Sequence, residues 1–256
     1  MKLKTNGIEL FVERTGEGDP IVFSGAWLDD LSIWDAQVKH FSSKYLTITY
    51  DQRGHGKSDK PETGRGNYSV QVLANDLVAL IQKLGLEKPV IVGFSLGGMV
   101  ALRFAADYPN SLSKLVLVGT CSKLVPPTGS RFLKAIGRLL PAKTFYRMLC
   151  KYRFYKPSEQ LANAWLQRAL KVDKAVAFES WGEWAEKCDL RDCVSKLQVS
   201  TLIIVGDKDE VFLGPCIELN ERIRGSQLKI IQGSGHTVSV EKPQEFNQVL
   251  EEFLAL

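Results

Sequence analysis

The sequence is poor in the residues that bind metals and form disulfides. Among 256 residues there are only three histidines and five cysteines, and no two cysteines form a C-x-x-C pair. Because the cysteines are odd in number and scattered, we interpret each as a small buried apolar residue and not as a zinc ligand. We therefore expect no metal ion. Cysteines without a disulfide pattern also fit a reducing compartment, so we expect a cytoplasmic setting. The cysteines are Cys121, Cys150, Cys188, Cys193 and Cys216.

Long apolar runs and nucleotide-binding motifs are also missing. No stretch of about 18 apolar residues occurs, so we expect no membrane span, and residues 1–7 contain no apolar core of signal-peptide length. Neither a G-x-G-x-x-G nor a P-loop pattern is present, so we expect no cofactor. The composition, 45% hydrophobic and 24% charged, is that of a globular protein, and the length suits a single α/β domain.

Charge is unevenly distributed, although the net charge of +4 is mild. Between residues 123 and 156 there are nine Lys or Arg and no Asp or Glu. Residues 121–188 hold thirteen basic and five acidic residues, a sum of +8, so the rest of the chain sums to −4. A basic segment therefore interrupts a slightly acidic body.

Short apolar runs alternate with helical patterns. Asn6-Gly7 joins two flanking runs as a hairpin turn, and several later runs are almost continuously apolar, which is typical of parallel strands covered on both faces. We expect a helix over 70–84, with Ser69 as N-cap and Gly85 after its end, another over 96–107 and one at the C-terminal end. The expected strands are 2–5, 8–14, 20–23, 46–50, 89–92, 114–118, 201–205 and 227–231.

Residues 121–195 break this alternation. They carry helical patterns over 132–140, 144–151, 158–170 and 175–186, but no clear strand. We predict an α/β fold with a mostly parallel, doubly wound sheet, formed by residues 1–120 and 196–256. Residues 121–195, called the cap segment below, are expected to form a helical insertion between two core strands.

One motif carries nucleophilic chemistry. Gly93-Phe94-Ser95-Leu96-Gly97 matches G-x-S-x-G, follows an apolar strand and opens a helix. In that context the serine sits on a sharp strained turn with its Oγ exposed, and the free N–H groups of the helix N-terminus face a developing oxyanion. We predict that Ser95 is a nucleophile.

A serine nucleophile needs a base and an acid that orients the base. His236 lies in a glycine-flanked loop after the last expected strand, whereas His40 ends an expected helix and His55 lies in another loop. After the preceding strand, Gly206-Asp207-Lys208-Asp209-Glu210 offers three acids. We choose Asp209, because the order Ser95…Asp209…His236 is known for such a triad.

These motifs together resemble the α/β-hydrolase fold family over essentially the whole chain. Residues 51–59, DQRGHGKSD, are similar to the family's D-x-R-G-x-G-x-S segment, a structural hallmark more than a catalytic one. Gly206–Asp209 matches its G-x-x-D acid loop, and Gly233–His236 resembles its G-x-x-H loop. Some members place the acid after an earlier strand, here at Gly119-Thr120, where this chain has no carboxylate. The resemblance implies that the cap segment roofs the active site.

The chain departs from the family pattern where an oxyanion donor is expected. Many members carry His-Gly after the third strand, and the next residue donates its N–H. Counting back from Trp34, Gly25-Ala26 replaces that pair, so Trp27 becomes the donor together with Leu96. The other alignment, with Ser24-Gly25 as the pair, selects Ala26 instead.

The sequence thus predicts a serine hydrolase that cleaves a carboxylic ester, thioester or lactone of a small acyl substrate through an acyl-enzyme. The alternatives are hydrolysis of carrier-protein-bound esters, and carbon–carbon bond hydrolysis or a synthase reaction with the same triad. An alternative of another class is a ligand receptor without turnover. The basic cap segment could attract an acidic carrier protein or an anionic substrate, or only aid solubility. We expect no nucleic-acid or membrane partner.

Overall fold

A computed structural model describes residues 1–125 and 130–256. Its centre is an eight-stranded sheet with the order β1-β2-β4-β3-β5-β6-β7-β8. Strand β2 pairs antiparallel with both β1 and β4, and the other pairs are parallel, so the predicted mostly parallel sheet is confirmed. The strands are β1 (Lys2–Thr5), β2 (Ile8–Thr15), β3 (Pro20–Ser24), β4 (Leu46–Tyr50), β5 (Val90–Phe94), β6 (Lys114–Val118), β7 (Ser200–Gly206) and β8 (Gln227–Ile231).

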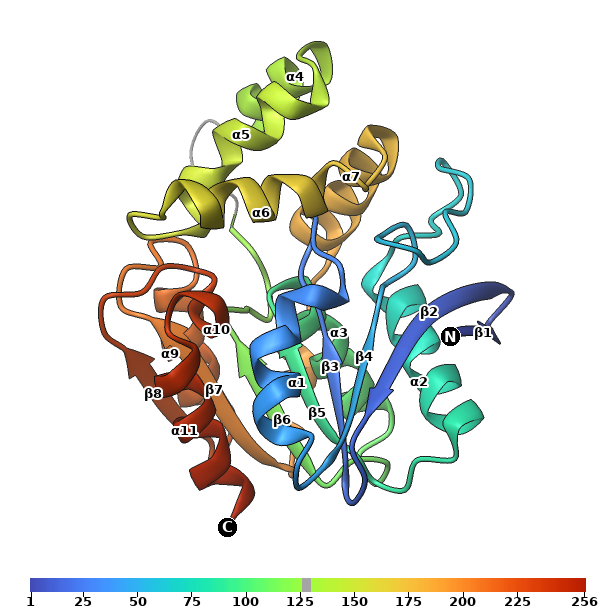
Figure 1. The fold of residues 1–256 in the computed structure, drawn as a ribbon, viewed down its shortest axis with the longest axis vertical. Coiled ribbons are helices and arrows are strands. Elements are labelled where there is room, and N and C mark those ends of the chain that lie inside the picture. Colours follow the sequence, from blue (N-terminus) through green and yellow to red (C-terminus); the bar gives the residue numbers. More distant parts are fainter. Residues whose placement is uncertain (126–129) are drawn as a thin grey trace.

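Both faces of the central strands are buried, as their continuous apolar runs require. Along β5, Ile91 packs in one hydrophobic cluster, whereas Val90 and Val92 pack in another. Helices α2 and α3 cover the first face, and α1 and α11 cover the second (Figure 1). The core is therefore two apolar layers separated by the sheet.

The helices of the core connect successive strands and cover both faces. Helix α2 begins where predicted, since the Ser69 hydroxyl accepts the N–H of Val72 (3.3 Å), and it ends at Gly85, whose φ is 62°. The core helices are η1 (Leu31–Trp34), α1 (Asp35–Phe41), α2 (Val70–Leu84), α3 (Leu96–Asp107), α9 (Leu213–Arg222), α10 (Val238–Glu241) and α11 (Pro243–Leu254). Sequence patterns did not predict α9.

In the described part of the cap segment, only helices lie between β6 and β7. They stand over one end of the sheet (Figure 1), and residues 126–129 of the segment are outside the described residues. The predicted helix over 175–186 is divided, because its second half is a wider π-helical segment. The cap elements are α4 (Ser130–Leu139), α5 (Ala142–Arg153), α6 (Glu159–Ala169), α7 (Lys174–Trp181), η2 (Gly182–Lys187) and α8 (Arg191–Val194). The division into core and cap domains stays a prediction.

Among the described helices, none combines the length and apolar composition that crossing a bilayer requires.

Candidate active site

The three residues predicted to form a triad follow three strands of the parallel part of the sheet. Ser95 comes directly after β5, Asp209 after β7 and His236 after β8. The carboxyl ends of parallel strands meet at one edge of a sheet, and there the three side chains lie beneath the cap segment. All three residues are almost fully buried, with 4%, 2% and 5% of their surface exposed.

Ser95 occupies the strained turn that its motif predicts. Its φ of 54° and ψ of −114° lie outside the regions that a non-glycine residue prefers. The turn is possible because a Cβ at Gly93 would lie 2.3 Å from the Gly97 carbonyl oxygen, and a Cβ at Gly97 would lie 2.4 Å from that of Ser24. The Thr120 hydroxyl donates to the Ser95 carbonyl (2.7 Å) and so braces the turn from the end of the next strand.

Of the three candidate acids, Asp209 contacts the histidine. Its Oδ2 lies 2.7 Å from His236 Nδ1. Asp207 instead accepts the N–H of Gly233 (2.6 Å) and so supports the loop before the histidine, and a hydrogen bond from neighbouring Lys208 lowers the Asp207 pKa. Glu210 is exposed. The geometry therefore gives each acid a different environment, and only that of Asp209 can orient the imidazole.

The imidazole of His236 is enclosed by aromatic and glycine neighbours. The ring of Phe212 stacks on it with centroids 4.5 Å apart, and the Phe94 ring lies at 4.8 Å. Gly119, the residue after β6, has a φ of 47°, and a Cβ there would lie 3.1 Å from His236 Nδ1. A larger residue at position 119 would crowd the ring, so this glycine leaves room for it.

Ser95 and His236, the predicted nucleophile and base, share neighbours. Among the described contacts, no hydrogen bond joins Ser95 Oγ to His236. The Ser95 N–H donates to the Val118 carbonyl (2.9 Å), one residue before the glycine that underlies the imidazole. Phe94, directly before Ser95, contacts the same ring. Catalytic hydrogen bonds are often long before substrate binds.

The predicted oxyanion donors are available. Leu96 is the first residue of α3, where helix N–H groups lack intrahelical partners. Within the described residues, the N–H groups of Leu96, Trp27 and Ala26 make no hydrogen bond. Both alignments of the segment that differs from the family's His-Gly pattern therefore leave a free N–H donor. The free N–H groups do not decide between Trp27 and Ala26.

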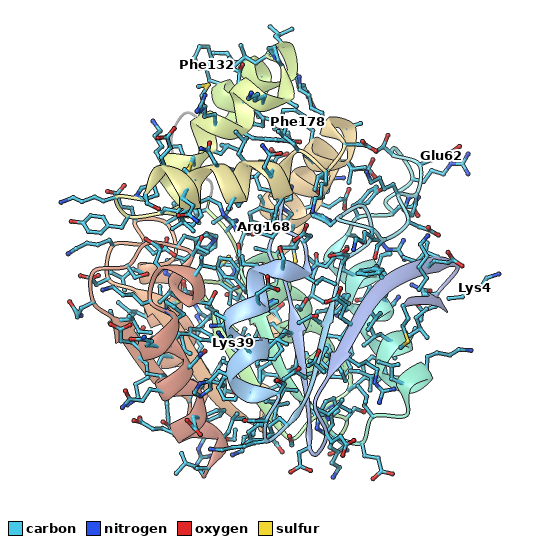
Figure 2. All side chains as sticks on the ribbon, in the orientation of Figure 1. Lys4, Lys39, Glu62, Phe132, Arg168 and Phe178 are labelled. Atoms are coloured by element: carbon cyan, nitrogen blue, oxygen red, sulfur yellow. The ribbon has the colours of Figure 1, made fainter. Side chains whose placement is uncertain are left out.

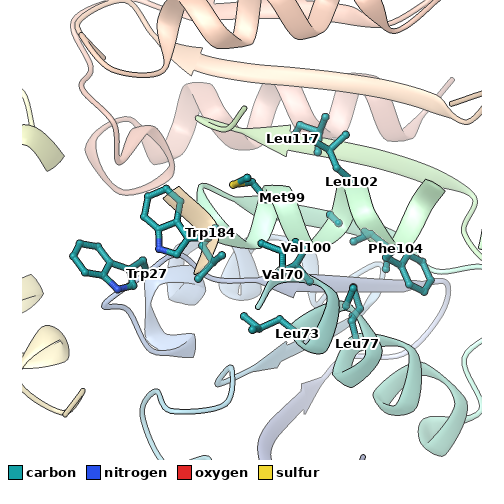
Figure 3. Close-up of a cluster of buried hydrophobic side chains, with 14 of the residues drawn as sticks. Trp27, Val70, Leu73, Leu77, Met99, Val100, Leu102, Phe104, Leu117 and Trp184 are labelled. Atoms are coloured by element: carbon teal, nitrogen blue, oxygen red, sulfur yellow. The ribbon is translucent and has the colours of Figure 1, made fainter. Parts of the chain in front are cut away.

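The side chain of Trp27 is held by the cap segment. Its indole N–H lies 3.2 Å from the Ala177 carbonyl oxygen and 3.0 Å from Ser180 Oγ, both in α7. The indoles of Trp181 and Trp184 lie 4.9 and 6.1 Å from it, centroid to centroid, and Figure 3 shows Trp27 beside Trp184. The side chains of Trp27, Trp181 and Trp184 thus form an aromatic cluster between the loop after β3 and the cap segment.

The segment that resembles D-x-R-G-x-G-x-S has a structural role. Asp51 accepts the N–H groups of Leu31 and Lys57 (both 2.7 Å). A Cβ at Gly56 would lie 2.1 Å from the Asp51 carboxylate, so only glycine fits. Arg53 forms a buried two-point ion pair with Asp76 (both contacts 2.6 Å). These contacts fix the loop after β4.

The other two histidines, His40 and His55, contact residues outside the predicted triad. His40 is exposed and lies 3.3 Å from Glu251. His55 is buried, with Nδ1 3.0 Å from the Arg53 carbonyl oxygen, and burial lowers its pKa. In the residues that the structure describes, no group of three His, Cys, Asp or Glu side chains could hold a metal ion.

Sequence reasoning missed several residues that shape the site. Thr120 braces the turn of Ser95, Phe212 stacks on the imidazole of His236, and Glu241 accepts the N–H groups of Tyr155 (2.7 Å) and Gly235 (3.1 Å). Glu241 thereby ties the cap segment to the histidine loop, and its burial raises its pKa. No motif marks these residues, because each acts through a contact between distant segments.

Comparisons with known proteins agree with this architecture. A family model of the alpha/beta hydrolase fold matches residues 19–243. Over 256 aligned residues the chain is 27% identical to 3-oxoadipate enol-lactonase 2 of Acinetobacter baylyi, covering 97% of this chain and 94% of that protein. It is 26% identical to a non-heme haloperoxidase of Rhodococcus erythropolis, covering 98% and 97%. An esterase from Exiguobacterium antarcticum superposes with a TM-score of 0.92 at 25% identity, covering 100% and 99%. The chain therefore belongs to the α/β-hydrolase fold family and is an enzyme of the hydrolase class.

Proposed function

We propose that this enzyme hydrolyses carboxylic esters or lactones with a small acyl group, by a triad of Ser95, His236 and Asp209. The observation that carries the proposal is the 2.7 Å contact between Asp209 and His236 Nδ1, at the sheet edge where Ser95 occupies a strained turn. This contact fixes the tautomer that leaves Nε2 free to accept a proton. Relatives named as an enol-lactonase and an esterase support the same reaction class.

The proposed reaction has two steps. Ser95 Oγ attacks the ester carbonyl while His236 takes its proton, and the oxyanion forms near the N–H groups of Trp27 and Leu96. His236 then protonates the leaving alcohol, which departs and leaves an acyl-enzyme. Water, deprotonated by His236, attacks the acyl carbonyl, releasing the acid and restoring Ser95. Each oxyanion donor contributes on the order of 3 kcal/mol to such a step.

A small acyl group is proposed because two indoles of the cap segment pack against Trp27, whose N–H is a proposed oxyanion donor. The indoles of Trp27, Trp181 and Trp184 lie within 6.1 Å of one another, centroid to centroid. A long acyl chain on this side would have to displace at least one of them. Short-chain esters and compact lactones need no such displacement.

The test is turnover of a panel of aryl esters, thioesters and lactones of graded acyl length, with Ser95→Ala as control. We expect hydrolysis of short esters or lactones, and a loss of about 10⁴-fold or more in kcat for the variant, which retains its thermal unfolding curve. Normal turnover by Ser95→Ala would refute the nucleophile. Turnover of carbon–carbon substrates alone would favour the alternative reaction class, and binding without turnover would favour a receptor.

We further propose an acidic carrier protein as the partner that presents the acyl group, on the basis of the charge on α5. Lys143, Arg147 and Lys151 are exposed, and their spacing of four places them along one side of the helix. Turnover of a carrier-bound ester should then fall with added salt and with Arg147→Glu, whereas turnover of a free ester should change with neither. Equal salt sensitivity of both substrates would contradict this partner.

A further inference from the structure

Residues 26–29, called the oxyanion turn below, adopt a conformation that their sequence does not favour. The Asp29 N–H donates to the Ala26 carbonyl (3.3 Å). Leu28 has a φ of 64°, whereas Trp27 is not among the residues with positive φ. This combination defines a type II turn, whose third position normally requires glycine. Leucine disfavours such a φ, so other contacts must hold the turn.

The guanidinium of Arg153, the last residue of α5, contacts the oxyanion turn at two points. Its Nη1 donates to the Trp27 carbonyl (3.3 Å), and its Nη2 pairs with the Asp29 carboxylate. Type I and type II turns differ in the orientation of the central peptide unit, to which the Trp27 carbonyl belongs. A donor on this carbonyl therefore stabilises the type II form specifically.

Arg153 is itself held tightly. Its side chain is only 9% exposed, and its Cζ lies 5.4 Å from the ring centroids of Phe94 and Trp165. Aromatic faces near a buried cation restrict where the guanidinium can lie. Phe94 directly precedes Ser95, so the arginine also packs against the nucleophile turn.

The backbone of Arg153 contacts the histidine loop. Its carbonyl accepts the N–H of Thr237 (3.0 Å) and the hydroxyl of Thr237 (3.1 Å), the residue after His236. One cap residue therefore contacts the oxyanion turn, the residue before the nucleophile and the residue after the base.

We propose that Arg153 is a positioning residue: it keeps Leu28 in the left-handed conformation and, by holding the Trp27 carbonyl and the Asp29 carboxylate, fixes the place of the whole oxyanion turn, whose first peptide unit carries the Trp27 N–H toward the oxyanion. This inference rests on the proposed function and adds a residue that no motif identified. It distinguishes Arg153 from Arg168 in α6, whose Nε pairs with the other oxygen of Asp29 (3.0 Å) but which makes no described contact with Trp27 or Leu28. Arg168 lies below α6 at the junction of cap and core (Figure 2), and it supplies a matched control.

The first experiment compares Arg153→Met, Arg153→Lys and Arg168→Met on a short aryl ester. Arg153→Met should lower kcat at least 30-fold with KM changed less than threefold, because the donor acts on the transition state. Its affinity for a short-chain trifluoromethyl ketone, which forms a tetrahedral adduct with serine, should fall in parallel. Arg153→Lys should lose less than Arg153→Met, and Arg168→Met should change kcat less than threefold. Thermal unfolding of each variant separates these effects from loss of fold.

The second experiment asks whether glycine replaces the arginine. On a Leu28→Gly background the type II turn no longer needs support, so Arg153→Met should there cost less than fivefold in kcat. An undiminished loss on that background, or equal losses for Arg153→Met and Arg168→Met, would overturn the proposal.

A crystal structure of Arg153→Met gives a readout that does not depend on activity. Leu28 should leave the left-handed region in this variant, and its retention there would also overturn the inference. If the wild-type protein shows no Ser95-dependent turnover, the proposed function fails, and the conformation of Leu28 still decides the role of Arg153.

Discussion

The ring of Phe212 stacks on the imidazole of His236, with centroids 4.5 Å apart and planes inclined by 19°. The same residue donates its backbone N–H to Asp209 Oδ1 (3.0 Å). Phe212 therefore contacts both the proposed base and the proposed acid, from the turn that opens α9.

Removing this stacking should slow catalysis without destroying the site. Aromatic pairs contribute about 0.5–1.5 kcal/mol beyond their burial, so Phe212→Leu should lower kcat/KM about three- to tenfold. Phe212→Tyr, which retains the aromatic face, should lose less. Steady-state kinetics on one aryl ester measures both variants, and an unchanged kcat/KM in Phe212→Leu would show that the ring does not hold the imidazole.

The positions of the proposed triad could be predicted from the sequence because each lies in a short loop after a strand of the parallel sheet. Parallel strands bring such loops to one edge of a sheet. The positions of Ser95, Asp209 and His236 after their strands therefore predict that the three residues lie at the same edge. The glycines at 93 and 97 are needed at this turn, since neighbouring carbonyl oxygens leave no room for a Cβ.

The residues that support the triad could not be predicted in this way. Thr120 and Arg153 act on residues that lie 25 and 126 positions away in the sequence, and Phe212 acts on Asp209 through a local turn. None of the three belongs to a recognisable motif. The strain at Leu28 is equally hidden, because leucine at that position gives no turn signal. The helix Leu213–Arg222 was missed because Gly214 and Pro215 near its start indicate a turn.

Asp209 and Asp207 provide a direct test of the acid, because they are two residues apart and have different contacts. Asp209→Asn should lower kcat by about 10⁴-fold, since an amide no longer stabilises the imidazolium and favours the wrong tautomer. Asp207→Asn should lower kcat less than tenfold, because it loses only support for the loop at Gly233. Comparable losses in the two variants would contradict the assignment of Asp209.

Asp51 should make stability depend on pH. Burial raises the pKa of this carboxyl to about 6, against the opposing effect of its hydrogen bonds from Lys57 and Leu31. A folded-state pKa above the unfolded value means that folding favours the protonated form. The resulting contribution is complete below about pH 4 and is lost as pH rises through 6.

The free energy of unfolding of the wild type relative to Asp51→Asn should therefore fall between pH 4 and pH 7. The expected decrease is on the order of 2–3 kcal/mol. Urea unfolding of both proteins at several pH values measures this difference, in which the other titrating groups cancel. A difference that stays constant or rises with pH would show that the buried carboxyl is ionised throughout.

Trp181 should limit the acyl length. Its indole lies 4.9 Å from that of Trp27 and 5.1 Å from that of Trp184, centroid to centroid, and the side chain is only partly buried. Trp181→Ala should open space above the oxyanion turn, because removing one indole leaves a void that a longer chain can fill with favourable apolar burial. The ratio of kcat/KM for octanoate to acetate aryl esters should rise at least about tenfold.

The control for this change is Phe132→Ala. Phe132 is 71% exposed on α4, at the far end of the cap segment (Figure 2), so its removal should leave the ratio unchanged. If Trp181→Ala lowers turnover of both esters equally, the indole supports the loop of Trp27 and does not bound the acyl pocket. If both variants raise the ratio, the cap as a whole sets chain length, because loosening α4 alone would then suffice to admit the longer chain.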